Sequence, residues 1–415
     1  MWASWEGRAA RGAVVALAAL VVVTSTAPVL ATGAAGGDAP LRSASQDFSH
    51  AELVRDFTIA AQHLTHTTAT LTPDEYPVRS DANGTWVVGD SSGWTSGFLP
   101  GALWLMYERT TDPAWRAAAE RWQAGLEGEK TNTSTHDVGF MLFNSFGSGY
   151  RLTGDDAYRQ VVLTAAQSLA TRYSPRVGSV RSWWGVHEPV FTVIIDNMMN
   201  LELLFWAAKH GGDTAWYDMA LSHALNSMRD HVRPDGSTYH VVDYSARTGQ
   251  VIARRTHQGY SDMSTWSRGQ AWAVYGFTMA YRETDDARFL ATARRTADYF
   301  LAQLPADHVP YWDFNLPSLS GEPRDSSAAA IAASALLELA ELEPDARNGR
   351  RYLRAATVIL GSLSSPAYLQ AETDRGAVLL HGTQHKPDGN YDTGLIFGDY
   401  YFLEALIRHA ARHDR

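Results

Sequence analysis

A short unit, an aspartate-containing turn followed by an amphipathic helix, recurs along this 415-residue chain. Four copies carry an aromatic residue soon after the aspartate: Thr-Asp-Pro-Ala-Trp at 111–115, Gly-Asp-Asp-Ala-Tyr at 154–158, Gly-Asp-Thr-Ala-Trp at 212–216 and Asp-Asp-Ala-Arg-Phe at 285–289. Each aspartate stands where a helix N-cap is expected, because its side chain can accept hydrogen bonds from the free N–H groups of the first turn. A looser copy near Asp345 and an N-terminal helix from about Ser49 to Thr67 bring the number of these predicted helices to six.

Between these units lies a second set of helices that are apolar on nearly all sides. They are predicted to begin near Ser96, Asp137, Asp196, Ser267, Asp325 and Asp392. A helix that is apolar all round is buried, whereas a helix with one charged stripe faces solvent. Six buried helices that alternate with six amphipathic ones predict an all-α fold. This fold is an (α/α)6 barrel, a six-hairpin toroid in which an outer ring of helices surrounds an inner ring.

A linear helical solenoid is the alternative arrangement of the same helices. Solenoids repeat at a fixed period, whereas the spacing here is irregular. The longest connections all precede helices of the apolar set: 174–195, 231–266, 305–324 and 364–391. Long loops collected at one end of a scaffold are where binding sites usually lie. The pattern therefore favours the ring, with a binding site at the mouth that these connections form.

The N-terminus has the pattern of an export signal. Arg8 and Arg11 precede an apolar run over 13–23, which is shorter than the roughly 20 residues that span a bilayer. We expect cleavage after Ala31, so that the mature chain is secreted or lies in the cell envelope, away from the membrane. An uncleaved anchor is the alternative. The predicted segments are a signal peptide over 1–31, a flexible leader over 32–47 and a single barrel domain over 48–415.

Composition narrows the possible function classes. A net charge of −10 argues against a nucleic-acid partner, because nucleic-acid surfaces on proteins are basic. The lack of cysteine excludes disulfides, thiolate metal sites and cysteine catalysis. Fifteen histidines are present, but no predicted helix pairs two close histidines with a carboxylate, so we expect no metal site. Fourteen tryptophans suit stacking on sugar rings, although core packing accounts for part of them.

Aspartates open four of the apolar helices, so a barrel would place their carboxylates around its mouth. They are Asp137, Asp196, Asp325 and Asp392. Each could instead be an ordinary N-cap that complements the helix dipole. Asp196 follows the apolar run 193–195, and desolvation there would raise the pKa of its carboxyl group, as a general acid needs. Asp325 and Asp392 have the sequence context of caps.

A second group of candidate residues lies at the start of the helix near Ser267. Arg268 and Trp272 are four residues apart and share one helix face, so a guanidinium and an indole could together hold a sugar carboxylate. The alternative is an arginine that pairs with an aspartate beside a core tryptophan. His240, in the preceding connection, could donate a hydrogen bond to a ligand or be an ordinary loop histidine.

Seven short motifs stand in a fixed order along the chain. They are Trp94-Thr-Ser-Gly-Phe, His136-Asp137-Val-Gly-Phe, Ile195-Asp196-Asn-Met-Met-Asn, His257-Gln-Gly-Tyr, Ser264-Thr-Trp-Ser-Arg-Gly-Gln-Ala-Trp272, Asp325-Ser-Ser-Ala and Gly398-Asp-Tyr-Tyr-Phe-Leu-Glu-Ala-Leu. Together they resemble the unsaturated glucuronyl hydrolases, glycoside hydrolase family 88. The resemblance runs from about Phe48 to the C-terminus, and several motifs in the right order are more specific than any one of them.

The resemblance implies an (α/α)6 barrel that uses no metal and no organic cofactor. It implies that Asp196 is the general acid/base and that Asp137 is the second catalytic carboxylate. The substrate-binding positions that it implies are Trp94, His136, His240, Gln258, Trp266, Arg268 and Trp272. The pair Trp183–Trp184 matches less cleanly, because either residue could take the family's position.

The implied substrate is an oligosaccharide whose non-reducing end is a 4,5-unsaturated uronic acid, the product of a polysaccharide lyase. Asp196 would protonate C4 of this vinyl ether and then accept a proton from the water that adds at C5. The alternatives are an unsaturated rhamnogalacturonyl hydrolase that acts on pectin fragments, a catalytically silent glycan-binding protein of the same fold, and a repeat scaffold for protein partners. The parent polysaccharide and the oligomeric state stay open at this stage.

Overall fold

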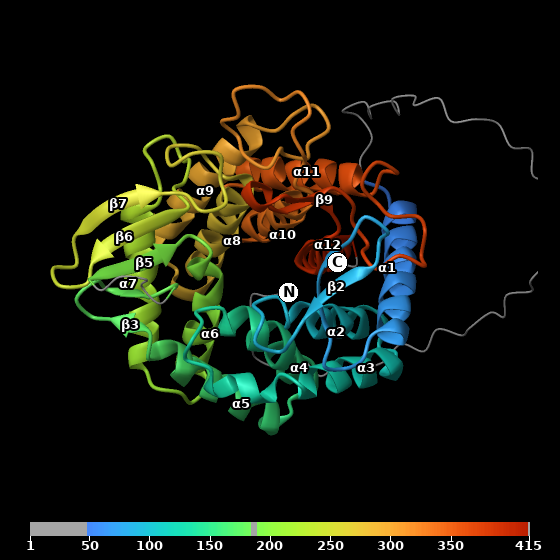
Figure 1. Cartoon of the computed structure of the whole chain (residues 1–415), viewed down its shortest axis with the longest axis horizontal. Helices are drawn as coiled ribbons and strands as arrows, with labels where there is room; N and C mark the ends of the chain where they lie inside the picture. The colour runs from blue at the N-terminus through green and yellow to red at the C-terminus, as the bar shows by residue number, and fades with distance from the viewer. Residues whose placement is uncertain (1–47, 184–188, 414–415) are drawn as a thin grey trace, which may run out of the picture.

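A computed structural model describes residues 48–183 and 189–413 and shows two concentric rings of helices (Figure 1). The inner ring consists of α2 (Phe98–Thr110), η2 (Gly139–Gly147) with its continuation α4 (Ser148–Thr153), α6 (Asn197–Lys209), α8 (Ser267–Thr284), α10 (Ser326–Leu342) and α12 (Ile396–His413). The outer ring consists of α1 (His50–Thr70), α3 (Pro113–Ala124), α5 (Asp156–Ala170), α7 (Ala215–Asp230), α9 (Ala287–Ala302) and α11 (Ala346–Leu363).

The inner ring closes on itself. Each inner helix packs against the next one along the chain, and α12 completes the circle by packing against α2. Every outer helix packs against the inner ring, several of them against two neighbouring inner helices, and α1 at the start of the domain packs against α12 at its end. This closure confirms the predicted (α/α)6 barrel and excludes the linear solenoid, in which the first and last repeats do not meet.

The aspartates of the recurring unit act as predicted. Asp112, Asp155, Asp286 and Asp345 each cap an outer helix by accepting a hydrogen bond from a backbone N–H of its first turn. Asp213 accepts a hydrogen bond from the backbone N–H of Ala215 in the same way, one residue before the N-cap of α7. A local sequence signal therefore sets where the outer helices begin.

Small residues let the inner helices approach one another closely. A Cβ atom added at Gly276 of α8 would lie 2.5 Å from the Cβ atom of Met198 in α6. One added at Gly101 of α2 would lie 2.8 Å from the ring of Tyr400 in α12. Nearly every residue of α10 from Ser326 to Leu339 is buried, as expected for a helix with neighbours on all sides.

Short antiparallel sheets, which the helical prediction did not include, occupy the long connections. They are β1 (Tyr76–Ser80) with β2 (Trp86–Gly89), β3 (Tyr173–Ser174) with β4 (Ser179–Val180), β5 (Val190–Ile194) with β6 (Val241–Ser245) and β7 (Val251–Arg255), and β8 (Gly382–His385) with β9 (Asn390–Thr393). Ile194 pairs with Val241, and the backbone N–H of Ile195 donates to the carbonyl of His240. The segments that lead into α6 and α8 are thereby joined at the mouth of the barrel.

One predicted helix start is wrong. The last inner helix begins at Ile396, and Asp392 lies before it, in β9, with a left-handed backbone (φ 60°). Asp392 is therefore not a helix cap, and its carboxylate is hydrogen-bonded to Nδ1 of His381, the residue before β8, at the open end of the β8–β9 hairpin. The hairpin takes up the residues that the apolar pattern had assigned to the beginning of the helix.

Several predictions concern residues outside those described. The signal peptide over 1–31, the leader over 32–47 and Trp184 all lie there. Among the described helices, none is long and apolar enough to cross a bilayer.

Candidate active site

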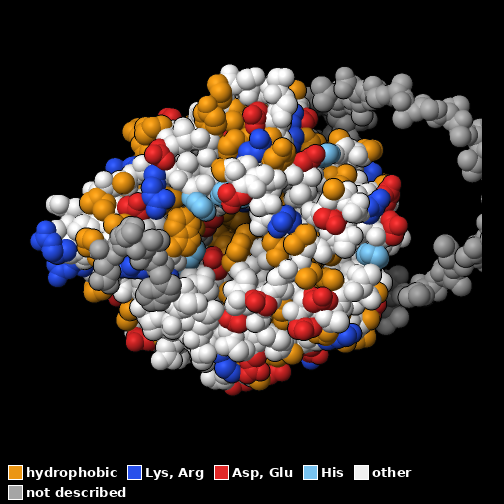
Figure 2. All heavy atoms as spheres, viewed as in Figure 1, with side chains coloured by type: hydrophobic (Ala, Val, Ile, Leu, Met, Phe, Trp, Pro, Cys, Tyr) orange, Lys and Arg blue, Asp and Glu red, His pale blue; other side chains and the backbone are white. Residues whose placement is uncertain are grey.

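An open pocket of about 290 Å³ lies at the mouth of the barrel, where the inner helices begin. Figure 2 shows a hollow near the middle of this face, with acidic and histidine side chains at its border. The lining residues come from the segments before α2, η2, α6 and α8 and from the β8–β9 hairpin: Trp94, His136, Asp137, Phe140, Trp183, Ile194, Asp196, His257, Gln258, Trp266, Arg268, Gln384, His385, Asp388 and Asn390. Seven of the nine predicted site residues are among them.

Asp196 lies at the N-terminal end of α6 but does not cap that helix with its side chain. It follows the buried strand β5, so its carboxyl group emerges from an apolar wall. Its Oδ2 atom is buried and has no hydrogen-bond partner within residues 48–183 and 189–413. The pKa of Asp196 is raised to about 7: burial is the main cause, the negative charge of Asp137 adds to the rise, and Arg268 opposes it.

Asp137 is held by the residues around it. The Asn200 side chain donates to its Oδ1 atom over 3.3 Å, and the Thr135 hydroxyl approaches its Oδ2 atom at 3.4 Å. The Nε2 atom of His136 lies 3.2 Å from Oδ1, and burial lowers the pKa of His136, which favours its neutral form. Asn200 also accepts a hydrogen bond from the backbone N–H of Phe140, so it connects α6 to η2.

His240 lies behind Asp196, outside the residues that line the pocket. Its Nδ1 atom accepts hydrogen bonds from the backbone N–H groups of His257 and Gln258, at 3.2 and 3.3 Å. An imidazole that accepts at Nδ1 carries its proton on Nε2, and this Nε2 atom is 3.8 Å from Oδ2 of Asp196. Burial holds the pKa of His240 well below its usual range, so the ring is neutral. The arrangement points a neutral N–H group toward the candidate acid.

Arg268 is almost completely buried at the edge of the pocket. Its guanidinium forms a 2.7 Å ion pair with Asp325 and donates to the carbonyl oxygens of Thr383 and Gln384 in the β8–β9 hairpin. Asp325 also caps α10 through the backbone N–H groups of Ser327 and Ala328. Of the two interpretations of Arg268, a ligand for a sugar carboxylate or a partner of an aspartate, the observed contacts match the second. The pair fixes the hairpin against the start of α8.

Trp272 is not brought to the pocket wall. Its side chain is 1% exposed, and its ring packs 5.4 Å from each of the rings of Phe140 and Tyr401, in the barrel core. The first turn of α8 faces the mouth, whereas the second turn already lies inside the inner ring. A shared helix face therefore did not ensure that Arg268 and Trp272 act together on a ligand, and a binding role for Trp272 stays a prediction.

Trp94, Gln258 and Trp266 do line the pocket as predicted. The Trp94 ring packs 4.9 Å from that of Phe397, and the Trp266 ring lies under the guanidinium of Arg268 at 4.5 Å. The Gln258 amide donates to the carbonyl of Gln384 over 2.9 Å, which ties the 256–260 loop to the hairpin.

Several lining residues were not predicted. Four of them come from the β8–β9 hairpin: Gln384, His385, Asp388 and Asn390. His257 stood within a recognised motif but was not proposed for the site; its ring lies 4.8 Å from that of His385 and 5.2 Å from that of Trp183. The segment 381–391, which leads into the last inner helix, was expected to border the pocket, but strands of four residues carry too little periodic pattern to be detected, so neither the hairpin nor these four residues were predicted.

Metal ligation was also considered for this site. In the part of the chain that the structure describes, no group of three or more His, Cys, Asp or Glu side chains is arranged to hold a metal ion.

Comparisons with known proteins agree with the resemblance seen in the sequence. Residues 66–357 match Glycosyl Hydrolase Family 88. The chain is 46% identical to an unsaturated glucuronyl hydrolase of Formosa agariphila, over 77% of this chain and 80% of that protein. It is 37% identical to an unsaturated glucuronyl hydrolase of a Bacillus species, over 81% and 91% of the two chains.

A crystal structure of an unsaturated glucuronyl hydrolase specific for heparin superposes with a TM-score of 0.85 at 40% identity, over 88% of this chain and 99% of that one. The family model covers well over half of the chain, and both sequence relatives exceed 30% identity. The chain is therefore a glycoside hydrolase and belongs to Glycosyl Hydrolase Family 88.

Proposed function

We propose that this enzyme removes a 4,5-unsaturated uronic acid from the non-reducing end of oligosaccharides that polysaccharide lyases produce. The observation that carries the proposal is the carboxyl group of Asp196, which is exposed to the pocket and has a pKa of about 7. A group with this pKa is partly protonated at neutral pH, so it can donate a proton and later take one back. The names of the family relatives support the substrate class.

In the proposed reaction, the Asp196 carboxyl group protonates C4 of the vinyl ether, and positive charge develops at C5. Water adds at C5 and gives its proton to the Asp196 carboxylate, which restores the acid. The product is a hemiketal that opens, and the glycosidic bond breaks as a consequence. Protonation occurs at a carbon atom of the ring, so the enzyme needs no second carboxylate to attack the anomeric carbon, unlike ordinary glycosidases.

Asp137 would keep this acid protonated and help to place the water. Its negative charge contributes to the raised pKa of Asp196, and its own position is set by Asn200 and Thr135. His240 would orient the carboxyl group of Asp196 through its Nε2–H group. Both carboxyl groups line one pocket, which favours an active hydrolase over a catalytically silent glycan-binding protein.

The proposal is tested by the absorbance of the conjugated uronate, which disappears when the double bond is hydrated. Purified enzyme should remove this absorbance from a panel of lyase-produced disaccharides, and the Asp196→Asn variant should not. Residual activity above about a tenth of wild type would contradict the role of Asp196, because positioned proton transfer is worth roughly 100-fold or more. Activity confined to pectin fragments would favour the rhamnogalacturonyl alternative.

We also propose that the mature enzyme acts outside the cytoplasmic membrane. The support is the export pattern over residues 1–31, where two arginines precede a short apolar run. The full chain expressed in its natural host should be found in the periplasm, cell wall or medium. A version without residues 1–31 should stay in the cytoplasm, and equal distribution of the two would contradict export.

A further inference from the structure

One buried arginine joins the two segments that carry the candidate acids. Arg172 follows helix α5 and is 4% exposed. Its guanidinium donates to three backbone carbonyl oxygens, those of Thr133 (2.6 Å), Arg181 (2.9 Å) and Ser182 (2.8 Å). Arg172 itself lies outside the residues that line the pocket, so it contacts the pocket wall from behind.

The bond to Thr133 supports Asp137. Thr133 stands four residues before Asp137, and the backbone N–H of Asp137 donates to the Thr135 hydroxyl over 3.1 Å. Four residues with a hydrogen bond among them have little freedom. A fixed carbonyl at Thr133 therefore fixes the place from which the Asp137 side chain extends.

The bond to Ser182 supports Asp196. Ser182 is buried, and its hydroxyl accepts from the backbone N–H of Ile194 over 2.8 Å and donates to the Asn197 side chain over 2.9 Å. Ile194 and Asn197 stand on either side of Asp196 in the chain. Ser182 therefore holds the backbone on both sides of this acid, and Ser182 is in turn held by Arg172.

The guanidinium also places a positive charge near Asp137 and His136. Burial lowers the pKa of Arg172 to about 10, and the negative charge of Asp137 opposes this shift. The group therefore stays charged at neutral pH. Burial is the main cause of the lowered pKa of His136; the charge of Asp137 opposes it, and the charge of Arg172 adds to it. A buried charge costs free energy, so stability alone does not account for an arginine at this position.

We propose that Arg172 is a positioning residue, which fixes the separation between the carboxyl groups of Asp137 and Asp196 by holding both of their segments. Proton transfer requires the donor within hydrogen-bond reach of the atom that it protonates. A misplacement of about 1 Å can lower a rate by about 100-fold. The inference rests on the proposed function, since it assumes that these two carboxyl groups carry out the chemistry.

Arg172→Met keeps a long side chain and removes all three hydrogen bonds. It should lower kcat by about tenfold to 100-fold and change KM by less than about threefold, because Arg172 holds the acids and does not touch the substrate. Arg172→Lys keeps the charge and part of the donor capacity, so its kcat should lie between those of wild type and Arg172→Met.

Arg408→Met is the matched control. Arg408 is also buried (6% exposed) and donates to a backbone carbonyl, that of Ser334, but it lies on α12 in the barrel core. Its loss should lower Tm at least as much as the loss of Arg172, yet keep the kcat of the folded protein within about twofold of wild type. Equal losses of kcat in the two methionine variants would assign the effect to stability and overturn the proposal.

Hydrogen–deuterium exchange tests the geometry without turnover. In Arg172→Met the backbone amides of 131–138 and of 190–197 should both exchange faster, whereas in Arg408→Met these segments should not differ from the rest of the chain. Faster exchange in only one segment would overturn the proposal, and so would a kcat for Arg172→Met within about threefold of wild type. If the wild-type enzyme turned over no unsaturated disaccharide, the proposed function would fail, and the exchange result would still decide whether Arg172 holds the two segments together.

Discussion

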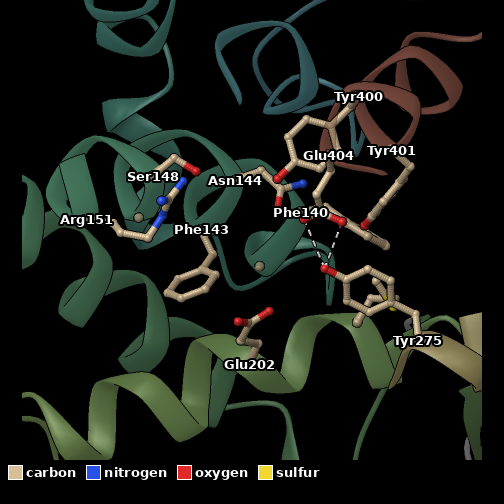
Figure 3. A pocket seen from close by; sticks show the side chains of 13 residues that line it. Phe140, Phe143, Asn144, Ser148, Arg151, Glu202, Tyr275, Tyr400, Tyr401 and Glu404 are labelled. Carbon is tan, nitrogen blue, oxygen red and sulfur yellow. Dashed lines mark hydrogen bonds between the residues drawn. The ribbon is translucent and has the colours of Figure 1, made fainter. Parts of the chain in front are cut away.

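Two carboxylic acids on helix α6 have similar pKa values but very different surroundings. Burial raises the pKa of Asp196 and that of Glu202 to about 7. They are six residues apart, or about 9 Å along the helix axis. Asp196 opens into the pocket at the mouth, whereas Glu202 lines a small chamber of about 20 Å³, room for about one water molecule, deeper in the barrel (Figure 3). Phe140 lines both spaces and separates them.

Glu202 and Glu404, which line the chamber, belong to a network of paired charges that extends beside it. Arg282 bonds to both Glu202 and Glu338, and Arg408 bonds to Glu338 over 2.9 Å. Figure 3 shows the hydroxyl of Tyr275 pointing at Glu404, to which it donates over 3.1 Å. These bonds join α6, α8, α10 and α12, so the network connects four helices of the inner ring.

At the mouth, by contrast, Asp196 forms no ion pair with an arginine or lysine of the described residues, and its charged neighbour Asp137 repels it. The comparison shows that a raised pKa does not by itself identify a catalytic acid. A catalytic acid must also be reached by substrate, and its proton must not be held by a structural partner. Asp196 lines the open pocket and has no such partner, whereas Glu202 is enclosed and is paired with Arg282.

The largest effect is expected on stability, when the network in the chamber loses its central cation. Arg282→Ala should lower the free energy of unfolding by about 3–5 kcal/mol, because it leaves the buried Glu202 without its cation and leaves Glu338 with Arg408 alone. The kcat of the protein that remains folded should change little. Denaturant titration and active-site titration measure the two quantities.

Arg288→Ala is the matched control for that variant. Arg288 also pairs with a carboxylate, Asp286, but it is 61% exposed, so water screens this pair and its loss should change stability little. Similar losses for Arg282→Ala and Arg288→Ala would show that the chamber network does not hold the inner ring together.

The second effect separates the two acids directly. Asp196→Asn should lower kcat by about 100-fold or more, because an amide cannot deliver a proton to carbon. Glu202→Gln removes a carboxyl group of similar pKa from the same helix, and should keep kcat within about twofold, since substrate does not reach it. Steady-state rates on one disaccharide give kcat for both variants. A comparable loss of kcat in the two would mean that the chamber takes part in catalysis.

These two regions also differ in how far the sequence could predict them. The periodic pattern and the capping aspartates predicted the helices and hence the barrel, because both signals act over one or two turns. The run of apolar residues before Asp196 predicted its burial. Nothing local identified the partners of Glu202, since Arg282 is 80 residues away in the chain and is also bonded to Glu338.

The same limit explains what was missed at the pocket. The β8–β9 hairpin contributes four lining residues, yet its strands are four residues long and follow a connection without a periodic pattern. Trp272 shares a helix face with Arg268, but Arg268 borders the pocket, whereas Trp272 is buried in the barrel core. Contacts between distant segments depend on the closure of the ring, which no short pattern encodes.

The third effect is on the pH dependence of the reaction. The wild-type kcat should fall as pH rises through about 7, because Asp196 loses the proton that it must donate. Asp137→Asn removes a negative charge that raises the pKa of Asp196, so the remaining activity should fall at a lower pH than in wild type. A rate profile from pH 5 to 9 measures the shift, and a profile that stays in place would mean that Asp137 does not tune the acid.

Stability gives an independent check of the same pKa. The folded-state pKa of Asp196 lies above its unfolded value of 3.8, so the native state binds the extra proton between these two values. Stability should therefore decline as pH rises from about 4 to about 7 and then level off. Asp196→Asn should remove this part of the decline, and the difference in Tm between the variant and wild type should be larger at pH 8 than at pH 4. An equal difference at both pH values would contradict a raised pKa.

The smallest effect is expected from a charged residue at the mouth of the barrel. Water screens charges there more strongly than it screens the buried charges of the chamber. Asp388 lines the pocket, and its side chain is 69% exposed. We expect its negative charge to repel a sulfate on the sugar beside the cleaved uronate, and so to disfavour sulfated substrates. Asp388→Asn should raise kcat/KM for a sulfated disaccharide relative to the unsulfated one by about twofold to fivefold at low salt, the range of an exposed charge pair.

Salt dependence decides whether this effect comes from a screened charge. The gain in Asp388→Asn should largely vanish at about 1 M salt, where the Debye length is about 3 Å. Glu127→Gln makes the same change in net charge at another exposed carboxylate (55% exposed), one outside the pocket lining, and should leave the preference unchanged. If both variants gave the same gain, the overall charge of −10 would set the preference, and not the carboxylate at the mouth. A gain that persists at high salt would mean that Asp388 contacts the substrate directly. Its carboxylate would then be shielded from solvent, as the buried charges of the chamber are.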